Sequence, residues 1–517
     1  SAGNQAVLGL EDLIEVLCEK TEVRAIGVHI EGLQDIPRFE RAALKALEQG
    51  TPIVALKTGS STIGAKLTVS HTGSLSGAND LYEALFERTG VISVTNPAQF
   101  LETLKYLCVV GAPRGTRVAG FTCSGGGATM LADHAEIIGL TFPVFENDTA
   151  KALKGLLPDI ATVSNPLDYT TPIWGQPEFT APVFETALKR PDIDAAILLQ
   201  DYPAAGLDDS KNYYQNDATA FAQSAAANNI PAMVCATLSE NLDVLTREHL
   251  IGIGVAPMQG IHEALNALLA ASLWRQARGR ILKARPAPLD PVAMPQSSIT
   301  LDEAEGKAWL AQSGLGIPKG RCSNGHQAPD VARDIGFPVA LKMMGPKLAH
   351  KTEAGAVALG LNSADDVANA VAAMRASVTA YGADAVTDHF LIEQMSGTPL
   401  AEFIVGIRRD PQFGFAMTLG SGGILVELVG DAKTVLLPAS LDDIQQALTG
   451  LRATKLLQGF RGRTVADLDG LAKSILEFSE YATSQSGTVY EVEINPLFVY
   501  ENSVQAVDVL LQVVGPT

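Results

Sequence analysis

The sequence predicts an α/β protein of 517 residues, with doubly wound parallel sheets followed by a separate α+β region. Short β-rich segments alternate with helical segments of about 10–15 residues in the first half, which is the pattern of βαβ units. Further on, a proline-rich stretch precludes regular structure and marks a linker (Pro286, Pro288, Pro291, Pro295). A chain of this length exceeds one core and suggests about three or four domains.

The alternation starts at the first residues. Helical periodicity is found in residues 9–20, 38–50 and 79–90, and β-rich segments are found in residues 25–31, 51–59 and 91–95. The pattern restarts after "GAPRGT", with a strand, a glycine-rich turn and a helix in residues 117–139, and buried strands in residues 194–202 and 231–237. We therefore place domains at residues 1–111 and 112–275, a linker at 276–297 and a last domain at 298–517. That last domain begins with a predicted helix capped by Thr300, with Glu303 three residues later as a capping box.

The bulk composition excludes several functional classes. The formal charge of −19 disfavours nucleic acid and anionic membranes as partners. Five scattered cysteines without a CxxC pair indicate free thiols in a reducing compartment. No run of 18 apolar residues and no signal peptide is present, so we expect a cytoplasmic protein.

The segment "TVSHTGSLSG" (68–77) places His71 between a predicted strand and a predicted helix. Loops at the carboxyl ends of parallel strands form the usual ligand crevice, and the backbone N–H groups of Gly73 and Ser74 at a helix start could bind a phosphoryl group. A neutral imidazole there could accept that group if a carboxylate oriented its other nitrogen, and Glu31 ends the preceding strand. The alternative interpretation is a histidine in a polar turn, and the residues alone leave both open.

The segment "TCSGGGAT" (122–129) has the form of a second phosphate cradle, with Ser124, Gly125 and Gly126 at the turn. It lacks the GxGxxG spacing, the P-loop lysine and the GxSxG nucleophile pattern. A tight turn that needs positive φ is an equally good explanation.

The C-terminal region carries an ordered set of chemical groups. Lys342 ends a predicted strand, where an ammonium could neutralise nucleotide phosphates. Glu493 and Asn495 lie two residues apart on one strand face, and Asp508 follows on a strand expected to pair with it. Oxygen ligands without thiolates suit Mg²⁺ shared with phosphate oxygens.

These motifs resemble the NDP-forming acyl-CoA synthetase superfamily, which includes succinyl-CoA synthetase and ADP-forming acetyl-CoA synthetase. "SHTGSLSG" resembles its phosphohistidine loop, "EINPL" followed by an aspartate resembles the magnesium end of its ATP-grasp domain, and "LAHKTEAGAVALGL" is similar to a segment with a second histidine. The resemblance implies two flavodoxin-like CoA-ligase domains followed by a C-terminal ATP-grasp domain. It also implies an acid–thiol ligase that forms an acyl-CoA from a carboxylic acid, ATP and CoA, releasing ADP and phosphate.

The resemblance further implies a role for each matching residue. His71 would be the phosphorylated nucleophile and Glu31 its orienting carboxylate. His350 would be a relay histidine, with Glu493 as its partner or a neighbour of the magnesium. The phosphate and acyl site would include Gly73, Ser74, Ser124, Gly125 and Gly126.

On the nucleotide side, Lys342 would hold phosphates, Glu402 would meet the ribose, and Asn495 and Asp508 would hold Mg²⁺. Further ATP-binding residues are expected on the predicted strands and the glycine-rich turn of the same domain: Glu393, Arg408 and Gly422.

One departure concerns CoA. The family usually begins with a Rossmann-like CoA-binding domain, whereas "SAGNQAVLGLEDL" resembles a segment inside the next domain, so an upstream domain or subunit is expected to supply that part. The identity of the acid cannot be read from the sequence: Tyr169 and Trp174 in segment 165–175 could line its pocket, or could equally be packing residues. We expect a homo-oligomer because the two histidines lie on separate domains and must meet. An ATP-grasp ligase with an amine acceptor, or a non-catalytic subunit, remains an alternative.

Overall fold

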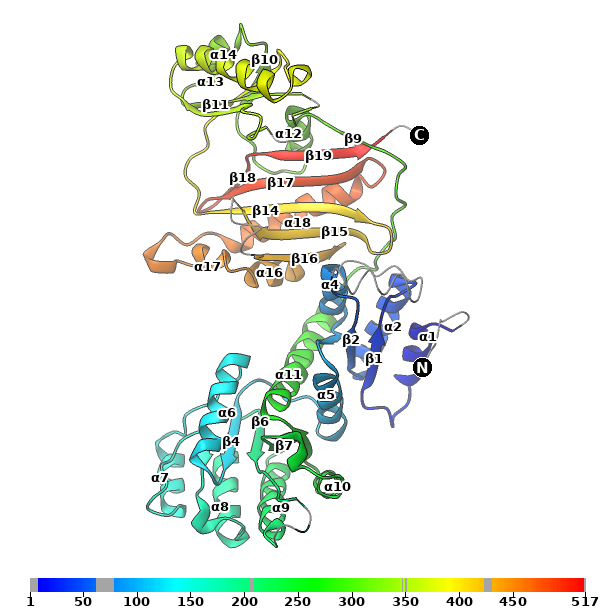
Figure 1. Ribbon diagram of the computed structural model, residues 1–517, viewed down its shortest axis with the longest axis vertical. Helices are drawn as coiled ribbons and strands as arrows, with labels where there is room; N and C mark the ends of the chain where they lie inside the picture. Colours follow the sequence, from blue (N-terminus) through cyan, green and yellow to red (C-terminus); the bar gives the residue numbers. More distant parts are fainter. Residues whose placement is uncertain are drawn as a thin grey trace. The chain divides into compact units, whose positions relative to one another are not determined.

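The computed structural model describes residues 8–61, 79–204, 206, 209–345, 347–348, 351–422 and 430–515. The chain divides into two compact units, with the main boundary between Arg285 and Pro286 (Figure 1). In the part that is described, no helix is both long and apolar enough to cross a membrane. All five cysteines are free thiols.

The first unit contains two parallel sheets. The first sheet has the order β1-β2-β3, with strands Ile26–Ile30, Ile53–Lys57 and Ile92–Val94. Its helices are α1 (Leu10–Leu17), α2 (Ile36–Gln49), α4 (Asn79–Thr89) and α5 (Pro97–Val109). Every strand–helix alternation predicted for this region is present.

The second sheet has the order β5-β4-β6-β7-β8, and all four pairings are parallel. Its strands are β4 (Val118–Thr122), β5 (Leu167–Asp168), β6 (Ala195–Leu199), β7 (Ala232–Ala236) and β8 (Ala256–Gln259). Its helices are α6 (Gly125–Ile138), α7 (Asn147–Leu156), α8 (Pro177–Leu188), α9 (Lys211–Ala227), α10 (Val244–Gly252) and α11 (Ile261–Lys283). Every residue of β4, β6 and β7 is buried, as expected for parallel strands covered on both faces.

The strand order places a topological switch point beside β4, because β5 and β6 lie on opposite sides of it. The crevice at the carboxyl end of β4 is therefore the position where open parallel sheets bind ligands. The glycine-rich turn before α6 opens into this position.

Helix α11 is longer than the sequence suggested. It continues to Lys283, so residues 276–283, which were expected to belong to the linker, are helical. Arg278 explains the extension, since its guanidinium donates to the carbonyls of Leu47 (2.8 Å) and Glu48 (3.1 Å) at the end of α2. These carbonyls lack partners within α2, and a cation there is favourable.

The second unit combines a small and a large antiparallel sheet. The small sheet has the order β10-β13-β11-β12. Its strands are β10 (Gly320–Ser323), β11 (Val339–Met343), β12 (Val357–Leu361) and β13 (Phe390–Gln394), and it packs against α13 (Ala328–Ile335) and α14 (Ala364–Tyr381).

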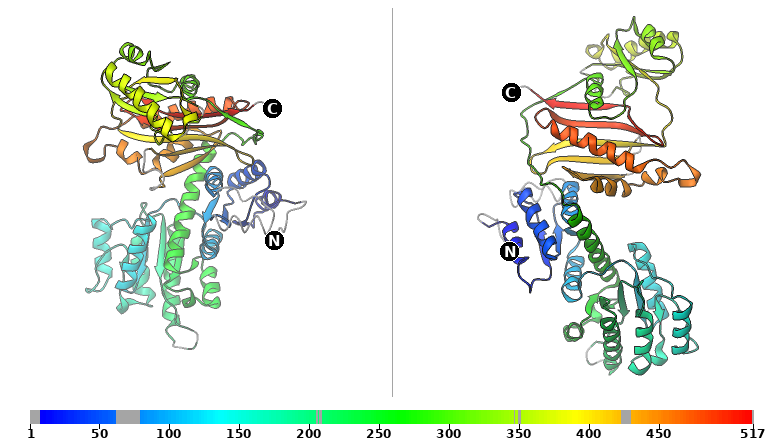
Figure 2. Two further views of the ribbon diagram at one scale, coloured as in Figure 1. Left: turned by 45° about the horizontal axis from the view of Figure 1, so that its top comes forward. Right: turned by 180° about the vertical axis from the view of Figure 1, so that it is seen from behind.

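The large sheet has the order β16-β15-β14-β17-β19-β9, with β18 paired to β17. Its strands are β9 (Ser298–Thr300), β14 (Ala401–Asp410), β15 (Gly414–Ser421), β16 (Ala432–Leu437), β17 (Val489–Val499), β18 (Val504–Ala506) and β19 (Val509–Val514). Helices α16 (Leu441–Thr449) and α18 (Leu468–Ser484) pack against one face, and α18 is seen in front of the sheet in the right view of Figure 2. The short helix α17 spans Thr454–Leu457.

Helix α12 (Glu303–Ala311) corrects the predicted capping box. Its N-cap is Asp302, whose carboxylate accepts from the Glu305 N–H at 2.8 Å, while Glu305 accepts from the Asp302 N–H at 3.0 Å. Thr300 is instead the last residue of β9, which pairs with β19. The sheet thus takes Thr300, and Glu303 is available for another role.

Candidate functional site

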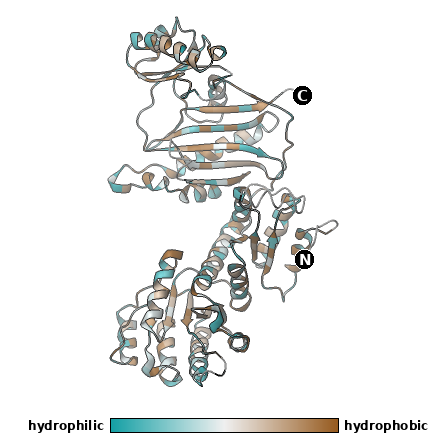
Figure 3. Cartoon of the chain, in the orientation of Figure 1, coloured by the Kyte–Doolittle hydropathy of each residue, from teal (hydrophilic) through white to brown (hydrophobic). Residues whose placement is uncertain are grey.

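One face of the large sheet is lined with polar residues, because the strand pattern changes phase within β17. Val492 and Ile494 are buried, but after Asn495 the buried residues are Leu497 and Val499. The register against β14 shifts at the same place, where three residues of β17 pass two of β14. This β-bulge keeps the apolar side chains on the helix-covered face. The alternation along these strands is visible as brown and teal bands (Figure 3).

Glu493 and Asn495 lie on the opposite, open face, and the backbone of Asp508 adjoins Asn495. The side-chain amide of Asn495 donates to Glu493 Oε1 at 3.4 Å, and the Asn495 backbone N–H donates to the Asp508 carbonyl at 3.2 Å. Asn495 and Asp508 therefore lie next to one another, but Asp508 is not on the paired strand that the sequence predicted: it lies in the two-residue gap between β18 and β19. Burial, followed by the nearby Glu303 carboxylate, raises the pKa of Asp508.

These three residues supply an oxygen donor set that fits Mg²⁺. They offer two carboxylates and one amide oxygen, and Mg²⁺ usually takes one or two protein carboxylates and completes its octahedron with phosphate oxygens and water. Among the described residues, no three histidine, cysteine or acidic side chains are grouped to hold a metal without such help. The donor set fits a metal bound together with a nucleotide.

Lys342 reaches the same region from β11 of the small sheet. Its ammonium contacts Glu303 Oε1, the Val507 carbonyl at 3.2 Å and Glu393 Oε2 at 3.2 Å. Burial alone would lower the pKa of Lys342, but the Glu303, Asp508 and Glu393 carboxylates outweigh it and raise that pKa above its usual value. Lys342 is a permanently charged group inside the fold.

Glu303 is the centre of this charged cluster, and the sequence did not identify it. Its side chain has no exposed surface and contacts three ammonium groups, those of Lys342, Lys307 (2.9 Å) and Lys351 (2.8 Å). Burial would raise the pKa of Glu303, but the three lysines hold it well below its usual range. The i,i+4 spacing of Glu303 and Lys307 in "EAEGK" was the available signal.

Glu393 lies in the interior of this cluster. Lys307 Nζ lies 2.5 and 2.6 Å from its two carboxylate oxygens, and its strand β13 is paired on both sides, with β10 and β11. The structure therefore puts the Glu393 carboxylate in a buried ion pair.

Glu402 and Gly422, both expected at the nucleotide, lie side by side. The Gly422 N–H donates to the Glu402 carbonyl at 2.6 Å, and a Cβ at position 422 would come within 2.8 Å of the Phe403 nitrogen. Only glycine fits such a close approach of two backbones. Arg408 lies six residues further along β14, opposite Glu491 and about 20 Å from Glu402 by strand rise, so these two are not brought together.

The glycine-rich turn of the second sheet caps α6. The Ser124 hydroxyl accepts from the Gly127 N–H at 3.5 Å, and Asp168 at the end of β5 lies 3.5 Å from where a Cβ of Gly125 would stand. Gly126 has only Ser124 within contact range of such a Cβ. The N–H groups of the first turn thus start a helix of 14 residues beside the switch point of the sheet.

The segment after β5 differs in part from the expectation. Tyr169 has no exposed surface and donates to Asp217 at 2.8 Å, so it is a core residue and does not line a pocket. Trp174 is half-buried and packs against Tyr213 and Tyr214, with ring centroids 5.4 and 4.8 Å apart.

In the first sheet, Glu31 is exposed and directly follows β1. Burial lowers the pKa of Lys57 at the end of the neighbouring strand, and the Glu31 carboxylate partly offsets this. His71, Gly73, Ser74 and His350 lie outside the described residues.

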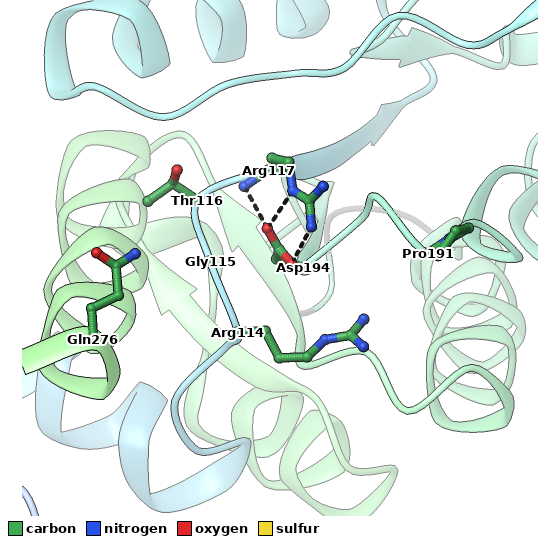
Figure 4. A pocket seen from close by; sticks show the side chains of 7 residues that line it. All are labelled: Arg114, Gly115, Thr116, Arg117, Pro191, Asp194 and Gln276. Atoms are coloured by element: carbon green, nitrogen blue, oxygen red, sulfur yellow. Dashed lines mark hydrogen bonds and ion pairs between the residues drawn. The ribbon is translucent and has the colours of Figure 1, made fainter. Parts of the chain in front are cut away.

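A cavity of about 350 Å³ opens at the opposite, amino-terminal edge of the second sheet (Figure 4). Arg117 precedes β4 and Asp194 precedes β6; the Arg117 guanidinium donates to both carboxylate oxygens of Asp194, at 2.8 and 3.0 Å. This pairing neutralises the arginine, and the cavity lies away from the carboxyl edge where such sheets bind ligands.

Comparison with known proteins supports the nucleotide interpretation. Residues 293–513 match the ATP-grasp domain model, and residues 1–107 match the model of a succinyl-CoA ligase-like flavodoxin domain. An ADP-forming acetate–CoA ligase of Archaeoglobus fulgidus is 29% identical over 98% of this chain and 73% of its own length. A trans-feruloyl-CoA synthase from an unknown prokaryotic organism is 28% identical over 99% of this chain and 72% of its own. The beta subunit of an ADP-forming acetate–CoA ligase of Pyrococcus furiosus is 32% identical over 41% of this chain and 90% of its own length.

Proposed function

The chain belongs to the NDP-forming acyl-CoA synthetase superfamily as an ADP-forming acyl-CoA ligase, and we propose that it activates a small carboxylic acid through a phosphohistidine at His71. ATP, Mg²⁺ and CoA are the reactants and cofactor of this proposal. The observation that carries it is an oxygen donor set (Glu493, Asn495, Asp508) near the buried lysine cluster, in which Lys342 comes from the small sheet and contacts the Val507 carbonyl beside Asp508. This arrangement supplies the charges that a metal–triphosphate complex requires.

In the proposed first step, an imidazole nitrogen of His71 attacks the γ-phosphorus of ATP and ADP leaves. Glu31 would hold the other imidazole nitrogen, and His350 would act as a relay. Asn495 and Asp508 would hold Mg²⁺, with Glu493 beside them, and the metal would supply positive charge for the nucleotide phosphates.

In the second step, an oxygen of the substrate carboxylate attacks the phosphorus of phosphohistidine, which releases the imidazole and gives an acyl phosphate. The N–H groups at the start of α6, with Ser124, Gly125 and Gly126, would bind the phosphoryl oxygens. The CoA thiol then attacks the acyl carbon, loses its proton, and phosphate leaves.

The test is to incubate the protein with γ-labelled ATP and Mg²⁺ without CoA. We expect protein-bound label that is labile in acid and stable in alkali, present in the wild type and lost in His71→Ala. His350→Ala should slow labelling if that histidine is a relay. ATP binding without any label would favour an amine-accepting ATP-grasp ligase or a non-catalytic subunit.

We also propose that the protein works as a homo-oligomer, because the two histidines lie on separate domains and must meet; relatives of Pyrococcus furiosus are named as the beta and alpha subunits of one ligase. Light scattering during size-exclusion chromatography measures this directly, and a monomer at all concentrations would contradict it.

A further inference from the structure

The three lysines around Glu303 differ in how many of their ammonium N–H groups face an acceptor within the protein. An ammonium group has three N–H donors. Lys342 faces three acceptor oxygens, from Glu303, Val507 and Glu393. Lys307 also faces three, two on Glu393 and one on Glu303. Each of these two ammonium groups donates two hydrogen bonds inside the protein and has one further carboxylate oxygen at ion-pair distance.

Lys351 is different among the lysines of this cluster. Among the described residues, its ammonium lies 2.8 Å from Glu303 Oε2, and its next acceptor is Asp508 Oδ1 at 3.7 Å, beyond hydrogen-bond distance. The contact with Glu303 is an ion pair without hydrogen-bond geometry, because Oε2 accepts no hydrogen bond. Lys351 therefore retains donors for another group.

The exposure of the three lysine side chains also distinguishes Lys351 from the other two. The side chain of Lys351 is 16% exposed, whereas those of Lys342 and Lys307 are 5% and 4% exposed. The Lys351 ammonium also lies 3.7 Å from Oδ1 of Asp508, whose backbone carbonyl accepts from the Asn495 N–H.

We infer that Lys351 is the ammonium group that binds the β and γ phosphates of the nucleotide, and that Glu303 is its positioning residue while Lys342 is an internal support. This inference rests on the proposed function and changes the role expected for Lys342. Lys342 contacts the buried carboxylates of Glu303 and Glu393 and so holds Glu303 in place. Glu303 in turn positions Lys351 through their ion pair. Loss of Lys342 would leave both carboxylates underpaired and weaken the fold.

The first test measures binding of Mg-ATP and of adenosine to the full chain. Lys351→Met should weaken Mg-ATP binding at least tenfold, leave adenosine binding unchanged and keep the melting temperature of the wild type. Lys351→Arg should restore most of the affinity. Lys347→Met is the matched control, since Lys347 lies in the same segment but is 60% exposed and pairs with Asp384. Equal affinity of Lys351→Met and wild type would overturn the inference.

The second test separates positioning from simple structural support. Glu303→Gln should slow phosphoenzyme formation, and the double variant with Lys351→Met should be no slower than Lys351→Met alone, because the two residues act as one unit. Additive losses would contradict a positioning role for Glu303. Lys342→Met should lower the melting temperature. If Lys342→Met instead keeps the melting temperature of the wild type and loses Mg-ATP affinity, then Lys342 binds the phosphates and the inference is wrong.

The two proposals fail in different ways. If the wild type forms no phosphoenzyme, the proposed function is wrong, whereas Mg-ATP affinity still tests Lys351. If the wild type is labelled normally and Lys351→Met is labelled equally fast with equal Mg-ATP affinity, only the inference about Lys351 is wrong.

Discussion

Asp217 is a buried carboxylate that holds together the segment after β5. It has no exposed surface and accepts from Tyr169 Oη (2.8 Å), the Gly175 N–H (3.1 Å) and Thr180 Oγ1 (3.0 Å). Burial raises its pKa despite these donors. The hydrogen bonds that Asp217 accepts therefore stabilise the fold, although burying its carboxylate costs hydration free energy.

Replacing Asp217 by Ala should destabilise the first unit by about 3 kcal/mol, since three buried donors lose their acceptor. Tyr169→Phe should cost less, about 1 kcal/mol. Calorimetric melting of the intact protein measures both, with Asp209→Asn, an exposed neighbour, as control. If Asp217→Ala lowers the free energy of unfolding by less than about 1 kcal/mol, water must accept the hydrogen bonds that the carboxylate accepted.

Asp243 gives a prediction of pH dependence. It caps α10, and the Lys211 ammonium (2.9 Å), followed by the Thr246 N–H (2.7 Å), lowers its pKa from 3.8 to about 2. A carboxyl whose pKa is lower in the folded state adds stability above pH 4 and loses it as the pH falls to about 2.

Asp243→Asn keeps a side-chain acceptor but lacks this charge. The difference in unfolding free energy between wild type and Asp243→Asn should therefore be largest at pH 6 and shrink at pH 3. Urea unfolding at both pH values measures it. An equal difference at both would show that the charge contributes nothing.

At the residue scale, the sequence predicted the positions of those side chains that strand periodicity determines. Asn495 and Asp508 were expected on paired strands; their backbones are hydrogen-bonded, but Asp508 lies in the gap between β18 and β19. Glu303 was expected as a helix-capping residue and is instead a buried ion-pair centre, because Lys342 and Lys351, both far from it in sequence, join Lys307 of its own helix around it. Such convergence depends on tertiary packing, which local sequence patterns do not contain.

At the element scale, the start of α6 separates glycines that the fold requires from glycines that it does not. A Cβ at Gly127 would lie 2.8 Å from Thr122 Oγ1 and 3.0 Å from Leu199 Cδ2, whereas at Gly125 and Gly126 the nearest atoms are at 3.5 and 3.8 Å. The 2.8 Å distance at Gly127 is shorter than packed side chains tolerate, whereas the distances at Gly125 and Gly126 are ordinary van der Waals contacts.

Gly125→Ala and Gly126→Ala should therefore keep or slightly raise the melting temperature, because alanine is the better helix former. We expect each to lower kcat/KM at least tenfold, since the methyl group adds bulk beside the N–H groups proposed to bind phosphate. Gly127→Ala should instead destabilise the protein by about 1–3 kcal/mol. Full activity of both Gly125→Ala and Gly126→Ala would exclude α6 from the phosphate site.

Element ends were the least predictable part of the fold. The core of every predicted strand in the first unit is present, but α11 ends at Lys283 and α12 begins two residues later than its capping pattern indicated. Both shifts result from long-range partners: Arg278 bonds carbonyls of α2, and Thr300 joins β9 against β19. Propensity selects the type of element, and distant contacts decide where it stops.

At the scale of the whole molecule, the proline-rich segment packs with the second unit. Leu289 is 4% exposed, the Arg409 guanidinium donates to the Ala293 carbonyl at 3.1 Å, and the Gly515 N–H donates to the Ser297 carbonyl at 2.9 Å. A fragment of residues 286–517 should therefore unfold in one transition and bind Mg-ATP.

A fragment that begins at residue 301 lacks β9 and these contacts, so it should melt at a lower temperature. Circular dichroism and calorimetric titration of both fragments measure this. If the longer fragment is unfolded, or if both melt alike, the proline-rich segment contributes nothing to the second unit.

The bulge in β17 has a consequence for how this chain can vary. If β17 paired with β14 without this bulge, strict alternation would send the residues after Asn495 to the opposite faces. Leu497 and Val499 would turn toward water, or Glu493 and Asn495 would enter the apolar layer beneath α18. The polar face therefore depends on the number of residues in this strand as much as on their identity. A related chain with one residue fewer here would keep its apolar side chains on the buried face only by losing the bulge, so chains are aligned through this point by the number of residues in the strand.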